Sequence, residues 1–138
     1  MSRRLARRKA LQLLYQIDLT QSSPDEAWNQ SDVNEGLSAS AQEFAYNLVA
    51  GVRQHIADID QLIAGFAKDW TIDRMSYVDR NILRLAVYEL KYMPETPTKV
   101  AVNEAVELAK DFSDVQASKF INGVLGTVVE YLGRNPDE

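Results

Sequence analysis

The sequence predicts an all-α protein of about seven helices, and three observations lead to this fold class. Apolar residues recur at spacings of three and four along most of the chain, as they do on the buried face of a helix. Residues typical of helix starts stand before several of these segments. No stretch alternates branched apolar and polar residues between hairpin turns, as paired strands do.

Two helices are expected before residue 36. The first covers about residues 5–19, where apolar side chains share one face: Ala6, Ala10, Leu13, Leu14 and Ile17. The second is short and begins with Ser23 as its cap, followed by Pro24 at the first helical position and Glu26 as the other half of a capping box.

Two more helices are expected before residue 70. A capping box of Ser40 and Glu43 predicts the start of the third, which should reach about Gln54. The fourth covers about residues 56–68, where apolar residues again recur at helical spacing: Ile56, Ile59, Leu62, Ile63 and Phe66.

Residues 76–92 predict a central helix around which the others pack. Apolar side chains cover most of its circumference, whereas a surface helix shows a single stripe. Ser76 and Asp79 resemble a capping box, and Pro94 ends the helix. The charged residues among these apolar neighbours are Arg80, Arg84 and Glu89. Charges in a packed helix need partners or solvent, so we expect at least one to face an exposed groove.

Two helices follow the central one. After the rigid turn 94–97, Thr98 is expected to cap the next helix. The last helix covers about residues 115–132 and contains Gly123 and Gly126. Each glycine costs about 1 kcal/mol in a lone helix, so we expect close helix packing to compensate for them.

Length and composition favour one compact domain over residues 1–138, with sub-bundles at about residues 3–68 and 74–133. With 138 residues, of which 46% are hydrophobic, the chain can bury a real core. It has no cysteine, which excludes disulfides and thiolate metal sites. No apolar run approaches the length of a membrane span. We therefore expect a soluble, cytoplasmic protein without a membrane partner.

Residues that could carry catalysis are sparse, and we predict no enzyme activity, metal site or cofactor. His55 is the only histidine and is expected to lie at a helix edge. Neither a nucleophile-elbow motif nor a glycine-rich phosphate loop is present. Glu104 and Glu107 lie one turn apart, a pattern typical of carboxylates that are solvated or paired with lysine.

A basic cluster at the N-terminus is the clearest functional signal. Its members, which precede any acidic residue, are Arg3, Arg4, Arg7, Arg8 and Lys9. The other 10 basic and 20 acidic residues give the remainder a charge of −10, although the whole chain carries only −5. A local basic surface on an acidic protein indicates a defined anionic partner rather than general affinity for nucleic acid.

The same cluster lies at the positive end of a helix dipole, where acidic residues would be more stable by about 0.3–1 kcal/mol per charge. A phosphate would convert this repulsion into binding, and Tyr15 on the same face could stack on an unpaired base. A frayed, solvated basic terminus is the alternative. Lys119 and Phe120, a basic residue beside an aromatic one, form a second candidate, with Phe120 in the core as its alternative.

Four ordered motifs resemble the NusB family of bacterial transcription antitermination factors. They are RRLARRKALQLLYQID, ILRLAVYEL, PTKVAVNEAVELAKDF and SKFINGVLG. The resemblance implies two packed three-helix bundles and binding of boxA RNA in ribosomal RNA transcripts. It also implies a heterodimer with NusE, a small-subunit ribosomal protein, and action with other Nus factors on RNA polymerase.

Carried over by position, the family's RNA-binding residues fall on three segments of this chain. They are Arg3, Arg4, Arg7, Gln12 and Tyr15 near the N-terminus, Arg84 in the central helix, and Lys119 with Phe120 in the last helix. Arg8 stands where many members have an acid, so it adds positive charge to this surface. The NusE surface is expected around Asp79 and Arg80.

Three other functions fit parts of the pattern. The first is a protein-interaction module, for example a homodimer that buries the arginine face. A second is an RNA methyltransferase, because a NusB-like domain precedes the catalytic domain in some of these enzymes, but no methyl-donor loop or cysteine nucleophile occurs here. The third is a purely structural helical domain, against which an uncompensated arginine cluster argues.

Overall fold

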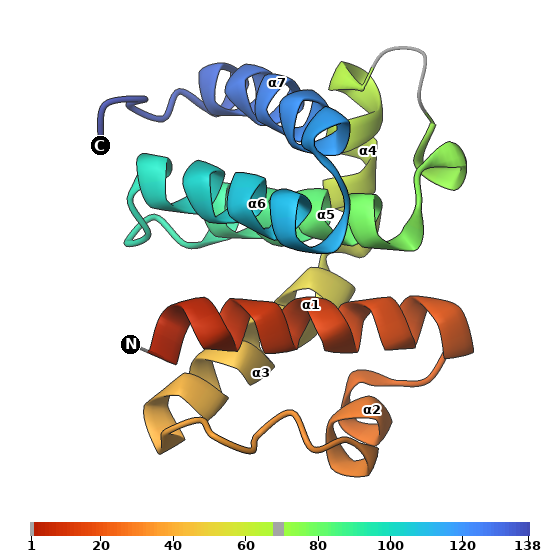
Figure 1. The fold of residues 1–138 in the computed structure, drawn as a ribbon. Coiled ribbons are helices and arrows are strands. Elements are labelled where there is room, and N and C mark those ends of the chain that lie inside the picture. The colour runs from red at the N-terminus through yellow and green to blue at the C-terminus, as the bar shows by residue number, and fades with distance from the viewer. Residues whose placement is uncertain (1, 68–70) are drawn as a thin grey trace.

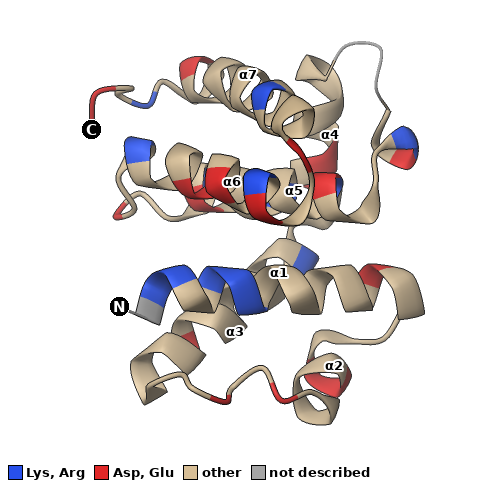
Figure 2. Cartoon of the chain, viewed as in Figure 1, with Lys and Arg blue, Asp and Glu red and all other residues tan. Residues whose placement is uncertain are grey.

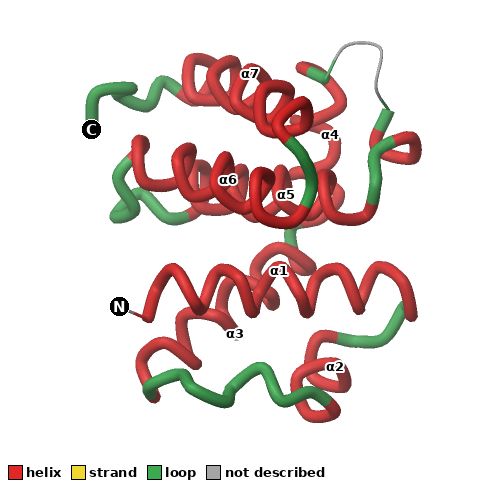
Figure 3. Tube along the Cα trace, viewed as in Figure 1, coloured by secondary structure: helices red, strands yellow, loops and turns green. Residues whose placement is uncertain are grey.

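The computed structural model describes residues 2–67 and 71–138, and all regular structure in these ranges is helical (Figures 1 and 3). The elements are α1 (Ser2–Thr20), α2 (Pro24–Gln30), α3 (Ala39–Gln54), α4 (Ile56–Phe66), a 3-10 turn η1 (Ile72–Arg74), α5 (Tyr77–Tyr92), α6 (Thr98–Phe112) and α7 (Val115–Leu132). The predicted all-α class is confirmed. The predicted fourth helix ended at Lys68, which lies outside the described residues.

Capping side chains explain most of the helix starts. The Ser23 capping box is confirmed, since its hydroxyl accepts from the Glu26 N–H while the Glu26 carboxylate accepts from the Ser23 N–H. The predicted cap of α3 was wrong by two residues, because the hydroxyl of Ser38, not that of Ser40, caps the helix by accepting from the Ala41 N–H.

The predicted cap of α6 was also wrong. Thr98 is the first helical residue, and Pro97 stands before it without a side-chain cap. The Thr98 hydroxyl instead accepts a hydrogen bond from Arg134 at 3.2 Å. The backbone carbonyl of Glu138 accepts from the Lys99 N–H at 2.8 Å, so the C-terminal segment satisfies part of this helix start.

The helices form two groups, with α1, α2 and α3 in one and α4, α5, α6 and α7 in the other (Figure 1). We predicted that residues 56–68 belong to the same sub-bundle as the earlier helices, whereas α4 packs mainly against α5 and α7. The reason is its apolar face: Ile59 and Ile63 are fully buried, and the turn at His55 directs α4 away from α3.

α5 is the central helix, as predicted. It contacts α1, α3, α4, α6 and α7. The fully or nearly fully buried residues of this helix are Asn81, Ile82, Leu83, Arg84, Leu85, Ala86, Val87, Glu89 and Leu90. Because three of them are polar or charged, their partners must come from neighbouring helices. No helix in the described ranges combines the length and apolarity that crossing a membrane requires.

The glycines of α7 do not serve close packing, and that prediction was wrong. Gly123 and Gly126 are exposed, and a methyl group added at either position would meet nothing within 4 Å. Close helix packing occurs at Gly51 of α3 instead, because the Tyr88 ring of α5 occupies the space that a Gly51 side chain would fill.

We therefore expect Gly126→Ala to raise the free energy of unfolding by up to about 1 kcal/mol, since alanine restricts the unfolded chain and fits the helix. Gly51→Ala is the matched control and should lower it by about 1–3 kcal/mol through overpacking. Urea denaturation followed by circular dichroism measures both. A loss of stability in Gly126→Ala would contradict the open environment of this position.

Candidate nucleic-acid interface

The predicted RNA-binding residues of α1 differ in how far they reach solvent. Arg3, Arg4, Gln12 and Tyr15 are exposed, and Arg8 is half-buried. Arg7 is only 5% exposed. The periodicity of the helix accounts for this, because Arg7 lies next to Ala6 and one turn before Ala10, both of which face the core.

Acidic residues of α6 lie opposite the exposed arginines of α1 (Figure 2). Arg4 donates two hydrogen bonds to Glu104, from Nε at 3.2 Å and from Nη2 at 2.7 Å. Arg8 donates one to Asp111 at 2.6 Å. Hydrogen bonding to the Glu104 carboxylate, which accepts from Arg4, together with its negative charge raises the pKa of the Arg4 guanidinium. The prediction of an uncompensated arginine cluster was thus wrong for Arg4 and Arg8, whose partners come from a helix distant in sequence.

Arg7 is held in the interior by α5. Its Nε and Nη2 donate to the two carboxylate oxygens of Glu89 at 2.9 and 2.7 Å, and both side chains are nearly inaccessible to solvent. A carboxylate oxygen of Glu104 lies 4.0 Å from Nη1 of Arg7. The Arg7 guanidinium therefore joins α1 to α5 through its hydrogen bonds and does not point to the surface.

Arg84 is likewise buried, at 4% exposed. Its Nε and Nη2 donate to Asp60 of α4 at 2.7 and 2.8 Å, and its Nη1 donates to Asp18 of α1 at 3.0 Å. Asp18 also accepts from Arg80 at 2.7 and 2.8 Å and from Asn81 at 3.0 Å. This cluster, which we call the Asp18 network, ties α1, α4 and α5 together.

The Asp18 network lowers the pKa of its central carboxyl group. Burial of Asp18 acts to raise the pKa, but the hydrogen bonds from Arg80 and Asn81 and the charges of Arg84 and Arg80 outweigh it. We expected at least one of the charged residues of α5 to face an exposed groove. Arg84 and Glu89 do not, because both are buried and paired. Arg80 is partly exposed and lies over the Tyr77 ring at 4.4 Å, but it is also bound to Asp18.

A cavity of about 450 Å³, which we call the α1 cavity, brings three predicted residues together. Arg8, Gln12 and Tyr15 line it together with Lys9 of the basic cluster and with four residues that were not predicted: Leu5, Leu11, Val78 and Phe112. Arg8 lies 4.7 Å from the Phe112 ring, and Tyr15 meets Tyr77 edge-on at 6.1 Å between ring centres. The cavity thus combines positive charge with exposed aromatic surface.

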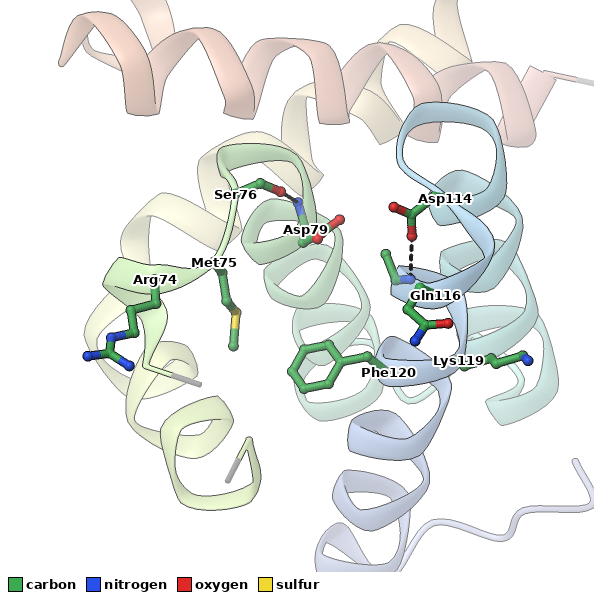
Figure 4. Close-up of a pocket in the computed structure, with 9 residues that line it drawn as sticks. Arg74, Met75, Ser76, Asp79, Asp114, Gln116, Lys119 and Phe120 are labelled. Atoms are coloured by element: carbon green, nitrogen blue, oxygen red, sulfur yellow. Dashed lines mark hydrogen bonds between the residues drawn. The ribbon is translucent and has the colours of Figure 1, made fainter. Parts of the chain in front are cut away.

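A second cavity of about 580 Å³, the α7 cavity, lies between the start of α5 and the start of α7 (Figure 4). Lys119, Phe120 and Asp79 all line it. The Phe120 ring points toward Met75, whereas Lys119 points away from it (Figure 4). Within the described residues, the Asp79 Oδ1 atom is buried and has no hydrogen-bond donor.

The remaining chemical candidates contact neighbouring side chains of the same chain. His55 stacks on Tyr92 with 4.1 Å between ring centres, at the junction of α3 and α4, as a helix-edge histidine should. Glu107 pairs with Lys110 at 3.5 Å, whereas Glu104 pairs with an arginine, contrary to the lysine pairing considered for it. The described part of the chain holds no group of three His, Asp or Glu residues that could bind a metal ion.

Sequence reasoning missed several residues that shape this surface. Phe112 and Tyr77 contribute exposed rings, and Asp111 and Glu104 hold the arginines. A signal for the acids was present, because residues 104 and 111 lie two turns apart on one face of a helix. Which helix this face meets is not encoded in that spacing.

The fold and this surface define a small, all-helical protein with exposed arginine and aromatic side chains beside one another, a combination typical of RNA-binding proteins. The sequence profile of the NusB family matches residues 4–130. The chain therefore belongs to the NusB family of transcription antitermination proteins, and the resemblance found in its motifs is confirmed.

Individual relatives match over nearly the full length. The chain is 48% identical over 130 residues to the transcription antitermination protein NusB of Pelotomaculum thermopropionicum, covering 94% of this chain and 90% of that protein. It is 43% identical over 137 residues to that of Myxococcus xanthus, covering 96% and 98%.

Solved structures match as well. T. maritima NusB superposes with a TM-score of 0.85 at 31% identity, covering 94% of this chain and 92% of that one. A crystal structure of antitermination factors NusB and NusE in complex with dsRNA contains a chain that superposes with a TM-score of 0.85 at 34% identity, covering 94% and 97%.

Proposed function

We propose that this protein binds boxA-type single-stranded RNA of ribosomal RNA transcripts together with NusE, and that it supports processive transcription by RNA polymerase with other Nus factors. The observation that carries the proposal is a pair of cavities that are both lined by the first turn of α5. Val78 lines the α1 cavity, and Asp79 lines the α7 cavity. A structural relative crystallised with NusE and dsRNA supports the choice of partners.

The residues that line the two cavities and the neighbouring arginines of α1 have different roles in this proposal. Arg4, Arg8 and Lys119, with Arg3 beside them, contact phosphates, which gives affinity without sequence preference. Tyr15 and Phe120 offer stacking surfaces, and Gln12 reads a base edge. Arg7 and Arg84 act on RNA binding only through the positions of α1 and α5, because both guanidinium groups are buried and donate to carboxylates of the same chain.

NusE is proposed to bind at the rim of the α7 cavity. The unsatisfied Oδ1 atom of Asp79 supports this, because a buried acceptor without a donor costs free energy that a donor from a partner would recover. Arg80 contributes by fixing the first turn of α5 through Asp18 and Tyr77.

Fluorescence anisotropy of a labelled boxA RNA, titrated with the protein alone and with NusE, tests the proposal. We expect preference for boxA over a scrambled RNA, tighter binding with NusE, and a loss of at least about tenfold in Arg4→Ala/Arg8→Ala, because each arginine contact to a charged group contributes on the order of 1 kcal/mol. The control Lys91→Ala/Lys99→Ala removes the same charge away from both cavities. The log–log salt slope should be about −0.7 per phosphate contact.

Equal, weak binding of boxA and scrambled RNA even with NusE would reject the proposal.

The exposed apolar residues beside the α1 cavity, Leu5, Tyr15 and Phe112, favour a second candidate, a homodimer that covers this face. Sedimentation with and without boxA RNA separates the two, since RNA would dissociate a dimer formed over the arginines.

A further inference from the structure

Arg4 and Arg8 of α1, whose side chains reach solvent, are already engaged by carboxylates of the same chain. Arg4 presents Nε and Nη2 to both oxygens of Glu104, and its side chain is still 66% exposed. Arg8 binds one oxygen of Asp111, and these two side chains are 38% and 47% exposed. Both pairs cross from α1 to α6 at the edge of the proposed RNA surface.

A carboxylate and a phosphate make the same demand on an arginine. Each accepts two parallel N–H bonds from the guanidinium fork, so the donors that Glu104 occupies are those that a phosphate group would use. Solvent reaches Arg4 from outside, whereas the Glu104 side chain is 14% exposed and lies on the inner side of the pair. An RNA phosphate can therefore approach Arg4 while Glu104 still holds it.

We propose that Glu104 and Asp111 are internal competitors for the RNA backbone, which hold Arg4 and Arg8 until phosphates displace them and thereby set the affinity of the RNA surface. This inference rests on the proposed function. It adds two acidic residues of α6 that limit RNA binding, where the proposed function names only residues that promote it.

The geometry allows displacement without a large penalty. When Arg4 turns to a phosphate, the Glu104 carboxylate stays 4.0 Å from the buried Arg7. The positive charge of Arg7 therefore still compensates the negative charge of Glu104. Asp111 returns to water, because nearly half of its side chain is exposed. Arg7 remains bound to Glu89, so the packing of α1 on α5 does not depend on the exchange.

Competition of this kind acts on every RNA alike, because phosphate contacts carry no sequence information. Removing a competitor should tighten boxA and scrambled RNA by the same factor and leave their ratio unchanged. The result for the cell would be a protein whose arginines bind weakly to arbitrary RNA and need base contacts or NusE to reach useful affinity.

The test measures dissociation constants for both RNAs near 0.15 M salt, where charges beyond about 8 Å are largely screened. We expect Glu104→Gln to tighten both by about fivefold and Asp111→Asn by about twofold, the range that the measured energies of partly exposed ion pairs allow. Glu107→Gln is the matched control, since it removes the same charge from α6 but pairs with Lys110 rather than with α1.

The inference is overturned if Glu104→Gln and Asp111→Asn change affinity no more than Glu107→Gln does, or if only boxA binding tightens. Asp111→Asn, at the surface, keeps the test valid should Glu104→Gln unfold the protein, which thermal denaturation will detect. If the wild type binds neither RNA, the proposed function itself fails, which is a different outcome from unchanged affinity among the variants.

Discussion

Glu89→Gln should lower the free energy of unfolding by about 3–5 kcal/mol, because it leaves the buried Arg7 guanidinium without the carboxylate that binds it directly. Both hydrogen bonds between these side chains join α1 to α5, so the loss should appear as separation of the two helical groups. Urea denaturation measures the change in the free energy of unfolding. Glu95→Gln, an exposed acid in the turn after α5, is the control and should stay within about 0.5 kcal/mol of wild type.

The same pair separates structural from RNA-binding arginines. Arg7→Met should destabilise the protein about as much as Glu89→Gln, whereas Arg4→Ala should leave stability within about 0.5 kcal/mol and weaken RNA binding. The double variant Arg7→Met/Glu89→Leu should recover much of the loss, because apolar residues can replace a buried ion pair. If Glu89→Gln proves as stable as wild type, Arg7 does not depend on this partner and regains its place among the RNA contacts.

Asp18→Asn should also cost about 3–5 kcal/mol at neutral pH, because it removes the carboxylate that Arg80, Asn81 and Arg84 share. The pKa of Asp18 is lowered in the folded protein, so its contribution is fully present above the unfolded pKa of about 3.9 and is lost as the pH falls through the folded pKa. The difference between wild type and Asp18→Asn should therefore shrink below about pH 4.

Urea denaturation at several pH values between 7 and 3 tests this dependence. Asp73→Asn, an exposed acid of the 3-10 turn before α5, controls for the general effect of losing one negative charge. A difference between wild type and Asp18→Asn that stays constant down to the lowest pH would mean that the carboxylate charge is not what holds the Asp18 network together.

The sequence by itself determined where most helices lie and which one is central. The start at Ser23, the start at Ser76 and the end of α7 before Gly133 all match the structure, because caps and left-handed stops act on neighbouring backbone groups. The nearly all-round apolar surface of α5 likewise required burial on several sides. At the start of α3 the local signal did not suffice, because the capping residue is Ser38 and not the predicted Ser40.

Only the tertiary structure decided which charges reach solvent. Arg7 and its partner Glu89 are 82 residues apart in sequence, and Arg4 and Glu104 are 100 apart. Helical periodicity places such residues on a face but does not say which helix meets that face, since this depends on how all the apolar faces pack at once. For the same reason α4 packs with the later helices. Of four arginines that look alike in sequence, Arg7 is buried and joins two helices, whereas Arg3, Arg4 and Arg8 reach solvent to different extents.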